Sequence, residues 1–297
     1  MPQPSQPITS SPEPPGKRRR LSRHLARLGV LAIISFLMLR WFEHSQVFRP
    51  SRNFDALPGS TGLDWAEANF TATDGVKLNG WFFPAATNSP RGELAFLICH
   101  GNGGNISHRL GLVKSLHRLG AAVLVFDYRG YGRSEGSPGE TGTYLDAQAA
   151  HAWLVARGFA PSSVILLGES LGGGVASELV LRERTGGLVL QCTFTSIPDI
   201  GRELFPWLPV RTLSTIRYDT LARLPRVTVP VLVLHSRADT LIRFHHAERN
   251  FAAAREPKSF AEVAGDHSDA IWEQPAYTRA MEQFLTELVA LRKPPAK

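Results

Sequence analysis

The sequence predicts an α/β fold in which a mostly parallel, twisted sheet is covered by helices on both faces. Short apolar runs of strand type alternate with helix-compatible segments over most of the chain, which is typical of parallel sheets with helical crossovers. An antiparallel hairpin is expected before them, because runs 65–71 and 78–83 flank the turn-forming pair Asp74-Gly75. With 297 residues, of which 43% are hydrophobic, the chain is long enough to bury one such core.

The strands expected after the hairpin are unbroken apolar runs, as strands buried on both faces require. They cover residues 94–99, 121–126, 164–168, 188–192, 231–235 and 258–263. Cys99 and Cys192 end two of these runs, and neither belongs to a Cys-x-x-Cys pair or a lipidation motif. Both are therefore interpreted as small buried apolar residues.

Helices are expected between the strands wherever apolar residues recur at helical spacing. They cover residues 106–119, 143–156, a segment that includes 175–181, residues 244–254, and a long helix that begins near Pro275. The segment 193–228 is an exception, because it holds four prolines and no core strand. It is interpreted as a helical insertion with a small core of its own, or as a lid that walls an apolar substrate pocket or touches the membrane.

Residues 1–27 are predicted to form a disordered basic tail, since their first part is rich in Pro, Ser and Gln. Six basic residues and a single glutamate lie within this tail, which therefore supplies most of the formal net charge of +7. The remainder of the chain is close to neutral. The charge pattern therefore gives no indication of a nucleic-acid partner.

Residues 28–42 are predicted to be a membrane anchor. Their uncharged part, 28–39, would form about 18 Å of helix against a hydrocarbon core of about 30 Å. Arg27 and Arg40 can extend this span by snorkelling, and Trp41 suits the interface. No small-x-small cleavage site follows, which argues against a cleaved signal peptide.

A cleaved signal, including a twin-arginine signal at 18–20, and a soluble helix are the alternatives to an anchor. The basic tail predicts that residues 1–27 lie in the cytosol and that the large domain lies on the non-cytoplasmic side. Residues 43–64 are expected to be a linker, and residues 65–293 the folded domain.

Two Gly-x-Ser-x-Gly patterns occur, at 168–172 and 132–136. The first joins an apolar strand to a helix, so Ser170 lies where a tight turn exposes a nucleophile and where the amides at the start of the helix face a developing oxyanion. Glycines are needed beside this serine because side chains there would collide with the neighbouring strand or helix. The second pattern lies in a turn-rich stretch with Pro138, so Ser134 is interpreted as a loop residue.

An activated serine requires a base and a carboxylate that orients the base, and both are expected in loops after later strands. Asp239 follows the strand 231–235, and His267 follows the strand 258–263. The order Ser170, Asp239, His267 is the order expected for a nucleophile on a strand-to-helix turn. Alternative acids are Asp199, Asp219 and Asp266.

Two convergent backbone amides are needed to bind an oxyanion. Leu171, directly after the nucleophile, is expected to supply one. The polar, glycine-rich stretch 100–105 is expected to supply the other, from Asn102 or alternatively Gly103, with His100 supporting the loop.

No metal or organic cofactor is expected for this chemistry. The adjacent residues His245 and His246 lie in a predicted helix, where neighbouring side chains do not share a face. A metal site at this pair is therefore not expected.

Five short motifs carry a resemblance to the α/β-hydrolase superfamily, in the branch of membrane-anchored serine hydrolases that includes serine aminopeptidases and lysophospholipases. They are His100-Gly101-Asn102-Gly103-Gly104-Asn105, Asp127–Gly132, Gly168–Gly172, His235–Asp239 and Gly265-Asp266-His267. The resemblance spans about residues 65–290 and implies that 127–132 is a structural loop near the site. The chain departs from the common pattern at Ser236, where the family usually has glycine.

The expected activity is acyl transfer to water, in which Ser170 attacks an ester or thioester carbonyl of a small-molecule or lipid substrate. Amide or peptide cleavage by the same residues is the alternative. A catalytically silent, membrane-tethered binding protein is the alternative outside enzymology. The apolar stretch 205–209 favours a substrate with an apolar acyl group.

Overall fold

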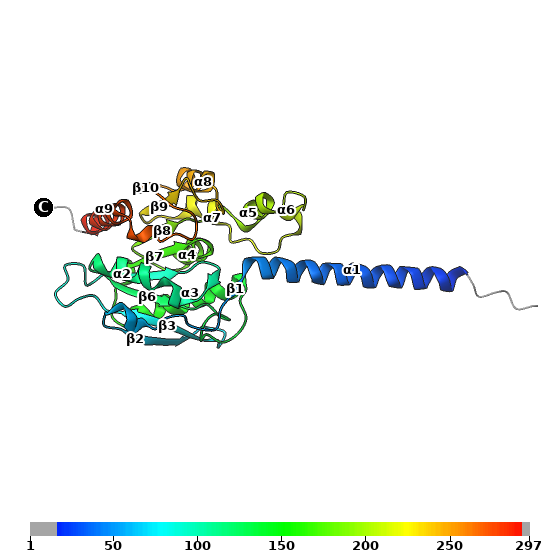
Figure 1. Cartoon of the computed structure of the whole chain (residues 1–297), viewed down its shortest axis with the longest axis horizontal. Coiled ribbons are helices and arrows are strands. Elements are labelled where there is room, and N and C mark those ends of the chain that lie inside the picture. Colours follow the sequence, from blue (N-terminus) through cyan, green and yellow to red (C-terminus); the bar gives the residue numbers. More distant parts are fainter. Residues whose placement is uncertain (1–16, 293–297) are drawn as a thin grey trace, which may run out of the picture. The chain divides into compact units, whose positions relative to one another are not determined.

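The computed structural model describes residues 17–292, with side chains described from residue 24. The chain divides into two compact units, which meet between Ser45 and Gln46. Nearly all of the first unit that is described belongs to one helix, and the second unit contains the whole sheet (Figure 1).

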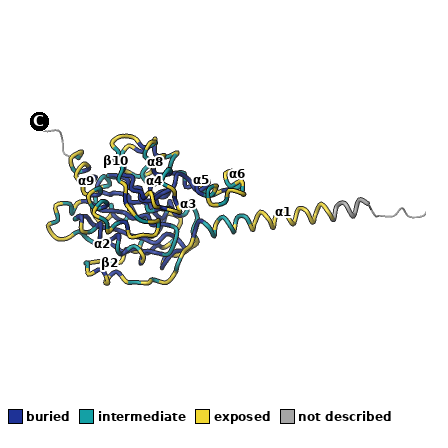
Figure 2. The backbone as a smooth tube through the Cα atoms, turned by 45° about the horizontal axis from the view of Figure 1, so that its top comes forward, coloured by how far each residue is buried: buried dark blue, intermediate teal, exposed yellow. Residues whose placement is uncertain are grey.

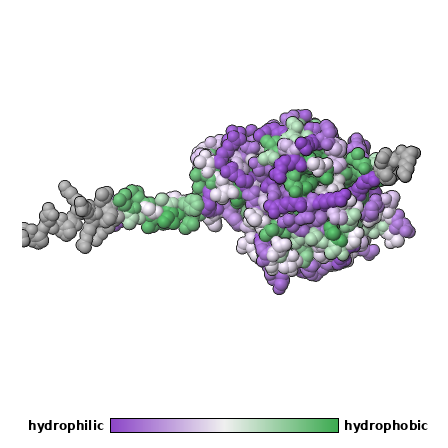
Figure 3. All heavy atoms as spheres, turned by 180° about the vertical axis from the view of Figure 1, so that it is seen from behind, coloured by the Kyte–Doolittle hydropathy of each residue, from purple (hydrophilic) through white to green (hydrophobic). Residues whose placement is uncertain are grey.

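Helix α1 runs from Lys17 to Val47, and its stretch from Leu28 to Leu39 carries no charged residue. Its part from His24 to Val47 has a mean hydropathy of 1.8 and is long and apolar enough to cross a membrane. The large apolar side chains of this stretch are exposed, as Figures 2 and 3 show. They are Leu25, Leu28, Val30, Leu31, Ile33, Ile34, Phe36, Leu37, Met38 and Trp41.

The predicted limits of the tail and the anchor differ from the structure. Residues 17–27, expected to be disordered, belong to α1, and the helix continues five residues beyond the predicted end of the anchor at residue 42. The physical reason is that Lys, Arg, Leu and Ala are good helix formers and that no proline interrupts the stretch before Pro50. Residues 1–16, the other part of the predicted tail, lie outside the described residues.

The central sheet has eight strands in the order β10-β9-β8-β7-β4-β6-β3-β2 (Figure 1). The strands are β2 Ala66–Thr71, β3 Lys77–Phe83, β4 Ala95–Cys99, β6 Ala122–Phe126, β7 Val164–Glu169, β8 Gly187–Gln191, β9 Val231–Ser236 and β10 Lys258–Val263. Among the described residues, β3 pairs antiparallel with β2 on one side and with β6 on the other. All other pairs are parallel, so the carboxyl ends of β4, β7, β8, β9 and β10 meet at one edge.

Helices cover both faces of this sheet. One face packs against α2 (Leu110–Arg118) and α9 (Pro275–Arg292). The other face packs against α3 (Glu140–Ala156), α4 (Leu171–Arg182) and α8 (His245–Ala253). The inner strands β4, β6, β7, β8 and β9 are buried almost without exception and form the dark interior of Figure 2, whereas the edge strands β2 and β10 are mostly half-buried or exposed. The predicted mostly parallel α/β sheet is therefore confirmed.

Short single-turn helices lie at the strand ends and in the loops. They are η1 Pro58–Thr61, η2 Ile106–Arg109, η3 Pro161–Ser163, η4 Leu224–Arg226 and η5 Ile271–Glu273. The helix expected over 106–119 is thus divided, with a 3₁₀ turn before α2. Asn105 caps this turn by accepting a hydrogen bond from the N–H of Ser107 at 3.0 Å.

The segment 193–228 folds into α5 (Ile197–Leu204), α6 (Val210–Leu213) and α7 (Thr220–Arg223). It does not have the small core of its own that was one of the two expectations. Its buried residues, among them Phe194, Ile200 and Tyr218, belong to the same apolar cluster as α3 and α4. Packing against the large core stabilises this segment more than a separate small core could, because so short a segment encloses little apolar surface.

The segment expected to be a linker also contains secondary structure. Arg49-Pro50 forms the short strand β1, which pairs in parallel with β5 (Gly103-Gly104). The stretch that follows α1 is therefore a fixed part of the second unit, adjacent to the loop after β4.

Candidate active site

Ser170 lies between β7 and α4 with φ 52° and ψ −115°. A non-glycine residue in this region costs on the order of 1–3 kcal/mol, and such residues persist where the surroundings hold them. The N–H of Ser170 donates to Gln191 O (2.9 Å), and its own carbonyl accepts from the Thr193 hydroxyl (2.6 Å). A Cβ on Gly172 would collide with the carbonyl of Cys99, which explains the need for glycine beside the serine.

The structure brings Ser170, His267 and Asp239 together from three loops at the carboxyl edge of the sheet. His267 Nε2 lies 3.1 Å from Ser170 Oγ, and His267 Nδ1 lies 2.8 Å from Asp239 Oδ2. With the ring proton on Nδ1, the imidazole donates to the carboxylate and accepts from the serine hydroxyl. This is the arrangement in which a histidine can take the serine proton.

Asp239 is buried and held by the loop that follows β9. Its Oδ1 accepts the backbone N–H groups of Leu241 (3.0 Å) and Ile242 (2.7 Å), which leaves Oδ2 for His267. His235 donates through Nε2 to Ile242 O at 2.7 Å and so supports the same loop from below. Burial lowers the pKa of His235 and keeps the ring neutral. Ser236 fits this loop, because its Oγ accepts the Ala238 N–H at 3.1 Å.

The alternative acids have other contacts. Asp199 lies in α5 and binds Arg211 (2.6 Å) and the Thr195 hydroxyl (2.8 Å). Asp219 caps α7 through the Ala222 N–H at 3.1 Å. Asp266 is exposed, and it accepts from the Thr240 N–H at 2.8 Å rather than from the imidazole of His267.

Ser134, in the second Gly-x-Ser-x-Gly pattern, is a buried loop residue. It donates to Asp127 O (2.7 Å) and accepts the N–H of Asn79 (3.0 Å). Both of its interactions therefore hold the turn against β3, and its hydroxyl is closed to solvent.

The loop after β4 is held through the carbonyl group of Asn102. The carbonyl of Asn102 accepts from the Arg49 N–H (3.1 Å) and from the Tyr131 hydroxyl (2.8 Å). Asn102, Ser170 and Leu171 all line one cavity. Within residues 17–292, the N–H groups of Asn102 and Leu171 donate no hydrogen bond, so both are available to an oxyanion.

His100 and Asp127 are buried beneath this loop. His100 Nδ1 donates to Gly101 O at 2.7 Å, and Asp127 Oδ1 accepts the Ile106 N–H at 3.0 Å. Burial lowers the pKa of His100 to about 3 and raises the pKa of Asp127 to about 8, so both side chains are neutral near pH 7. His100 thus has the supporting position that the sequence predicted.

A polar cavity of about 290 Å³ opens on one side of Ser170. Two of its lining residues, Arg109 and Glu169, were missed by the sequence analysis. Arg109 Nε donates to Glu169 Oε2 at 2.9 Å, and its Nη2 donates to Gly103 O at 3.3 Å. Glu169 precedes the nucleophile and could have been noticed on that ground, whereas the sequence carries no signal that places Arg109 here.

A second, more apolar cavity of about 170 Å³ is also lined by Ser170. Its walls come from α5 and the segment before it, from residues 241–242, and from the chain that leaves α1. The apolar residues among them are Val47, Phe194, Ile197, Ile200, Leu204, Phe205, Leu241 and Ile242. Ser170 therefore lines both a polar and an apolar cavity.

His245 and His246 differ from the sequence expectation. Their rings stack at the start of α8 with centroids 4.4 Å apart, and both face Glu203 of α5. The prediction that these adjacent side chains would not share a face was wrong. His245 is the first residue of the helix, and its ring stacks on the ring of His246.

Comparisons with known proteins agree with this geometry. A model of the alpha/beta hydrolase fold matches residues 95–225. The Alpha/beta hydrolase domain-containing protein WAV2 of Arabidopsis thaliana is 31% identical over 270 residues, which are 81% of this chain and 86% of that protein. The chain belongs to the α/β-hydrolase family. The chain is a hydrolase of this family.

Two further relatives are informative. The Lysophosphatidylserine lipase ABHD12 of Danio rerio is 32% identical over 219 residues, which are 64% of this chain and 57% of that protein. The solved esterase Pf2001 of Pyrococcus furiosus superposes with a TM-score of 0.66 and 21% identity, covering 80% of this chain and 98% of that one. The similarity to esterase Pf2001 shows a shared fold.

Proposed function

We propose that this α/β hydrolase is a membrane-anchored serine hydrolase that cleaves ester or thioester bonds of substrates with an apolar acyl group. The observation that carries the proposal is the chain of hydrogen bonds from Asp239 through His267 to Ser170. The serine at its end lies between an apolar and a polar cavity. No cofactor is needed for this chemistry.

In the proposed reaction, His267 Nε2 takes the proton of Ser170 as Oγ attacks the acyl carbon. The carbonyl π electrons move to oxygen, and the N–H groups of Asn102 and Leu171 stabilise the resulting oxyanion. His267 then gives its proton to the leaving alcohol or thiol as the acyl-enzyme forms. A water molecule repeats the sequence and releases the acid, while Asp239 keeps the imidazole oriented.

The two cavities suit different parts of the substrate. The acyl chain fits the apolar cavity beside α5, whose side chains exclude water. The leaving group fits the polar cavity, where the Arg109–Glu169 pair offers both charges. The similarity to a lysophosphatidylserine lipase supports a lipid ester with a polar head, and the lid-like position of α5 is part of this proposal.

The anchor is assigned to α1, because its apolar side chains are exposed over a length that fits a bilayer. The basic residues at 17–20 support a cytosolic N-terminus and a hydrolase domain on the other side of the membrane. Release of mature protein that begins near residue 45 into the soluble fraction would contradict this assignment.

A fluorophosphonate probe tests the nucleophile. We expect labelling of the full chain in detergent micelles, loss of labelling in Ser170→Ala, and retained labelling in Ser134→Ala, the matched serine of the second pattern. A correctly folded wild-type protein that is not labelled would instead support a silent binding protein.

A substrate series tests the bond that is cleaved. We expect p-nitrophenyl esters to be hydrolysed with a kcat/KM that rises with acyl chain length, and aminoacyl p-nitroanilides to be poor substrates. The reverse order of kcat/KM would favour the aminopeptidase-like alternative.

A further inference from the structure

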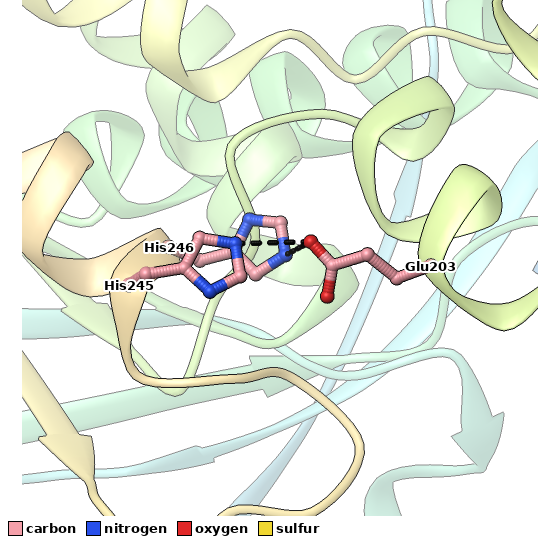
Figure 4. Close-up of side chains that lie close together, drawn as sticks. All are labelled: Glu203, His245 and His246. Carbon is pink, nitrogen blue, oxygen red and sulfur yellow. Dashed lines mark ion pairs between the residues drawn. The ribbon is translucent and has the colours of Figure 1, made fainter.

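Glu203, His245 and His246 bring three metal-binding side chains together outside the candidate active site. One nitrogen or oxygen atom from each lies within 4.8 Å of the others. Glu203 Oε1 is 2.9 Å from His245 Nε2 and 3.3 Å from His246 Nε2. Figure 4 shows the carboxylate pointing at both imidazole rings.

His246 supplies an independent indication of a ligand. The residue is 0% exposed, and its Nε2, 3.3 Å from Glu203 Oε1, has no hydrogen-bond partner among the described residues. An unsatisfied buried nitrogen is costly. A cation between the two rings and the carboxylate would satisfy it.

The surroundings of His246 can support a metal ligand. Its Nδ1 lies 2.9 Å from the Thr195 hydroxyl, which donates to Asp199 Oδ2 at 2.8 Å. The Thr195 N–H donates to Nδ1 at 3.1 Å, so without a metal Nδ1 accepts and the ring proton is on Nε2. A cation at Nε2 requires this proton to leave and the Thr195 N–H bond to break, after which Nδ1–H can donate to the Thr195 hydroxyl, as in metal-binding histidines.

We propose that Glu203, His245 and His246 form a binding site for a divalent transition-metal ion of the zinc type, with water completing the coordination. Two imidazole nitrogens and one carboxylate oxygen are a donor set that such ions take in proteins. The separations now present would need to change little, since ligands about 2.1 Å from a tetrahedral ion are roughly 3.4 Å apart.

The position of the site gives it a role in the hydrolase. Glu203 lies in α5, where Ile200 and Leu204 line the apolar cavity, and His245 follows the segment 241–242, which lines the same cavity. A bound ion would link these two walls. This consequence rests on the proposed function, whereas metal binding itself does not.

Zinc binding is measured on the full chain in detergent micelles, after chelation, by competition with a chromophoric chelator. We expect one equivalent to bind. Glu203→Gln and His245→Ala should each weaken binding on the order of 10- to 100-fold. Glu248→Gln is the matched control, because Glu248 is an exposed carboxylate of the same helix. His246 is not varied, since its buried contacts also support the fold.

Two further readouts separate this proposal from the catalytic one. Zinc should bind to Ser170→Ala as tightly as to the wild type. At about a hundredfold excess over its Kd, zinc should raise the Tm of the wild type by roughly 5 °C and leave the Tm of Glu203→Gln unchanged. In the active protein, zinc should change KM for long-chain esters more than kcat. The absence of bound zinc, or equal binding by wild type and Glu203→Gln, would overturn the proposal and leave a direct contact between Glu203 and His245 as the explanation.

Discussion

The backbone N–H of Arg49 donates to the carbonyl oxygen of Asn102 at 3.1 Å. Only one residue, Phe48, separates Arg49 from the end of α1, and Asn102 lies in the loop proposed to bind the oxyanion. Asn105 adds to this connection, because its Nδ2 donates to the carbonyls of Ser51 (3.2 Å) and Asn53 (2.6 Å). The chain that leaves the apolar helix is therefore part of the support of the candidate site.

Two N-terminal deletions test this connection. Deletion of residues 1–45 removes the first unit and keeps β1, so we expect a protein that hydrolyses soluble esters with nearly unchanged kcat. Deletion of residues 1–53 also removes β1 and the partners of Asn105, so we expect kcat to fall by more than tenfold. Steady-state kinetics on p-nitrophenyl butyrate distinguishes the two. Equal kcat values would show that the segment 46–53 does not support the loop.

Much of the fold could be predicted from the sequence, because buried parallel strands are continuous apolar runs. The last strand, 258–263, was placed at its observed limits, and the others within a few residues. Ser170, Asp239 and His267 could be singled out because each follows such a run in a position where function requires a loop. Their catalytic roles remain predictions.

The remaining features depend on contacts that no local pattern encodes. The pair β1–β5 has only two residues in each strand and no apolar alternation, so it could not be distinguished from a linker. Arg109 reaches Glu169 across 60 positions, and Glu203 reaches His245 across 42. Such pairs are established only when the sheet brings separate loops to one edge.

The hydroxyl of Tyr131 provides a second test of the loop after β4. Tyr131→Phe removes the hydrogen bond to Asn102 O and should make the position of the Asn102 backbone less well fixed. A typical hydrogen bond contributes about 1 kcal/mol, so we expect kcat to fall about fivefold with little change in KM. Tyr144→Phe is the control, because that hydroxyl donates to Glu140 instead. Equal losses of kcat in both variants would indicate a general effect on the fold.

Leu204 tests the assignment of the apolar cavity to the acyl chain. This residue lines the cavity but is 47% exposed, so Leu204→Trp can narrow the cavity without overpacking the core. We expect KM for p-nitrophenyl decanoate to rise several-fold while KM for the acetate stays unchanged. Leu291→Trp, on α9 at another exposed leucine that does not line this cavity, should alter neither value. A uniform change across chain lengths would contradict an acyl-binding role.

Asp127 should make the stability of the protein depend on pH. Burial raises the pKa of its carboxyl to about 8, whereas the ordinary value is 3.8. Between these values the folded protein keeps a proton that the unfolded chain releases, so the contribution of Asp127 to stability is fully present below about pH 4 and is lost as the pH rises toward 8. Burial lowers the pKa of His100 to about 3, so this neighbour does not titrate in the folded protein over the same range.

Asp127→Asn removes this titration and keeps an oxygen that can accept the Ile106 N–H. We therefore expect the free energy of unfolding of the wild type to fall relative to that of the variant as the pH rises from 5 to 8. The difference should grow by at most about 1.4 kcal/mol per pH unit. Urea unfolding of both proteins at several pH values measures it. Parallel pH profiles would mean that Asp127 is ionised in the folded protein at these pH values.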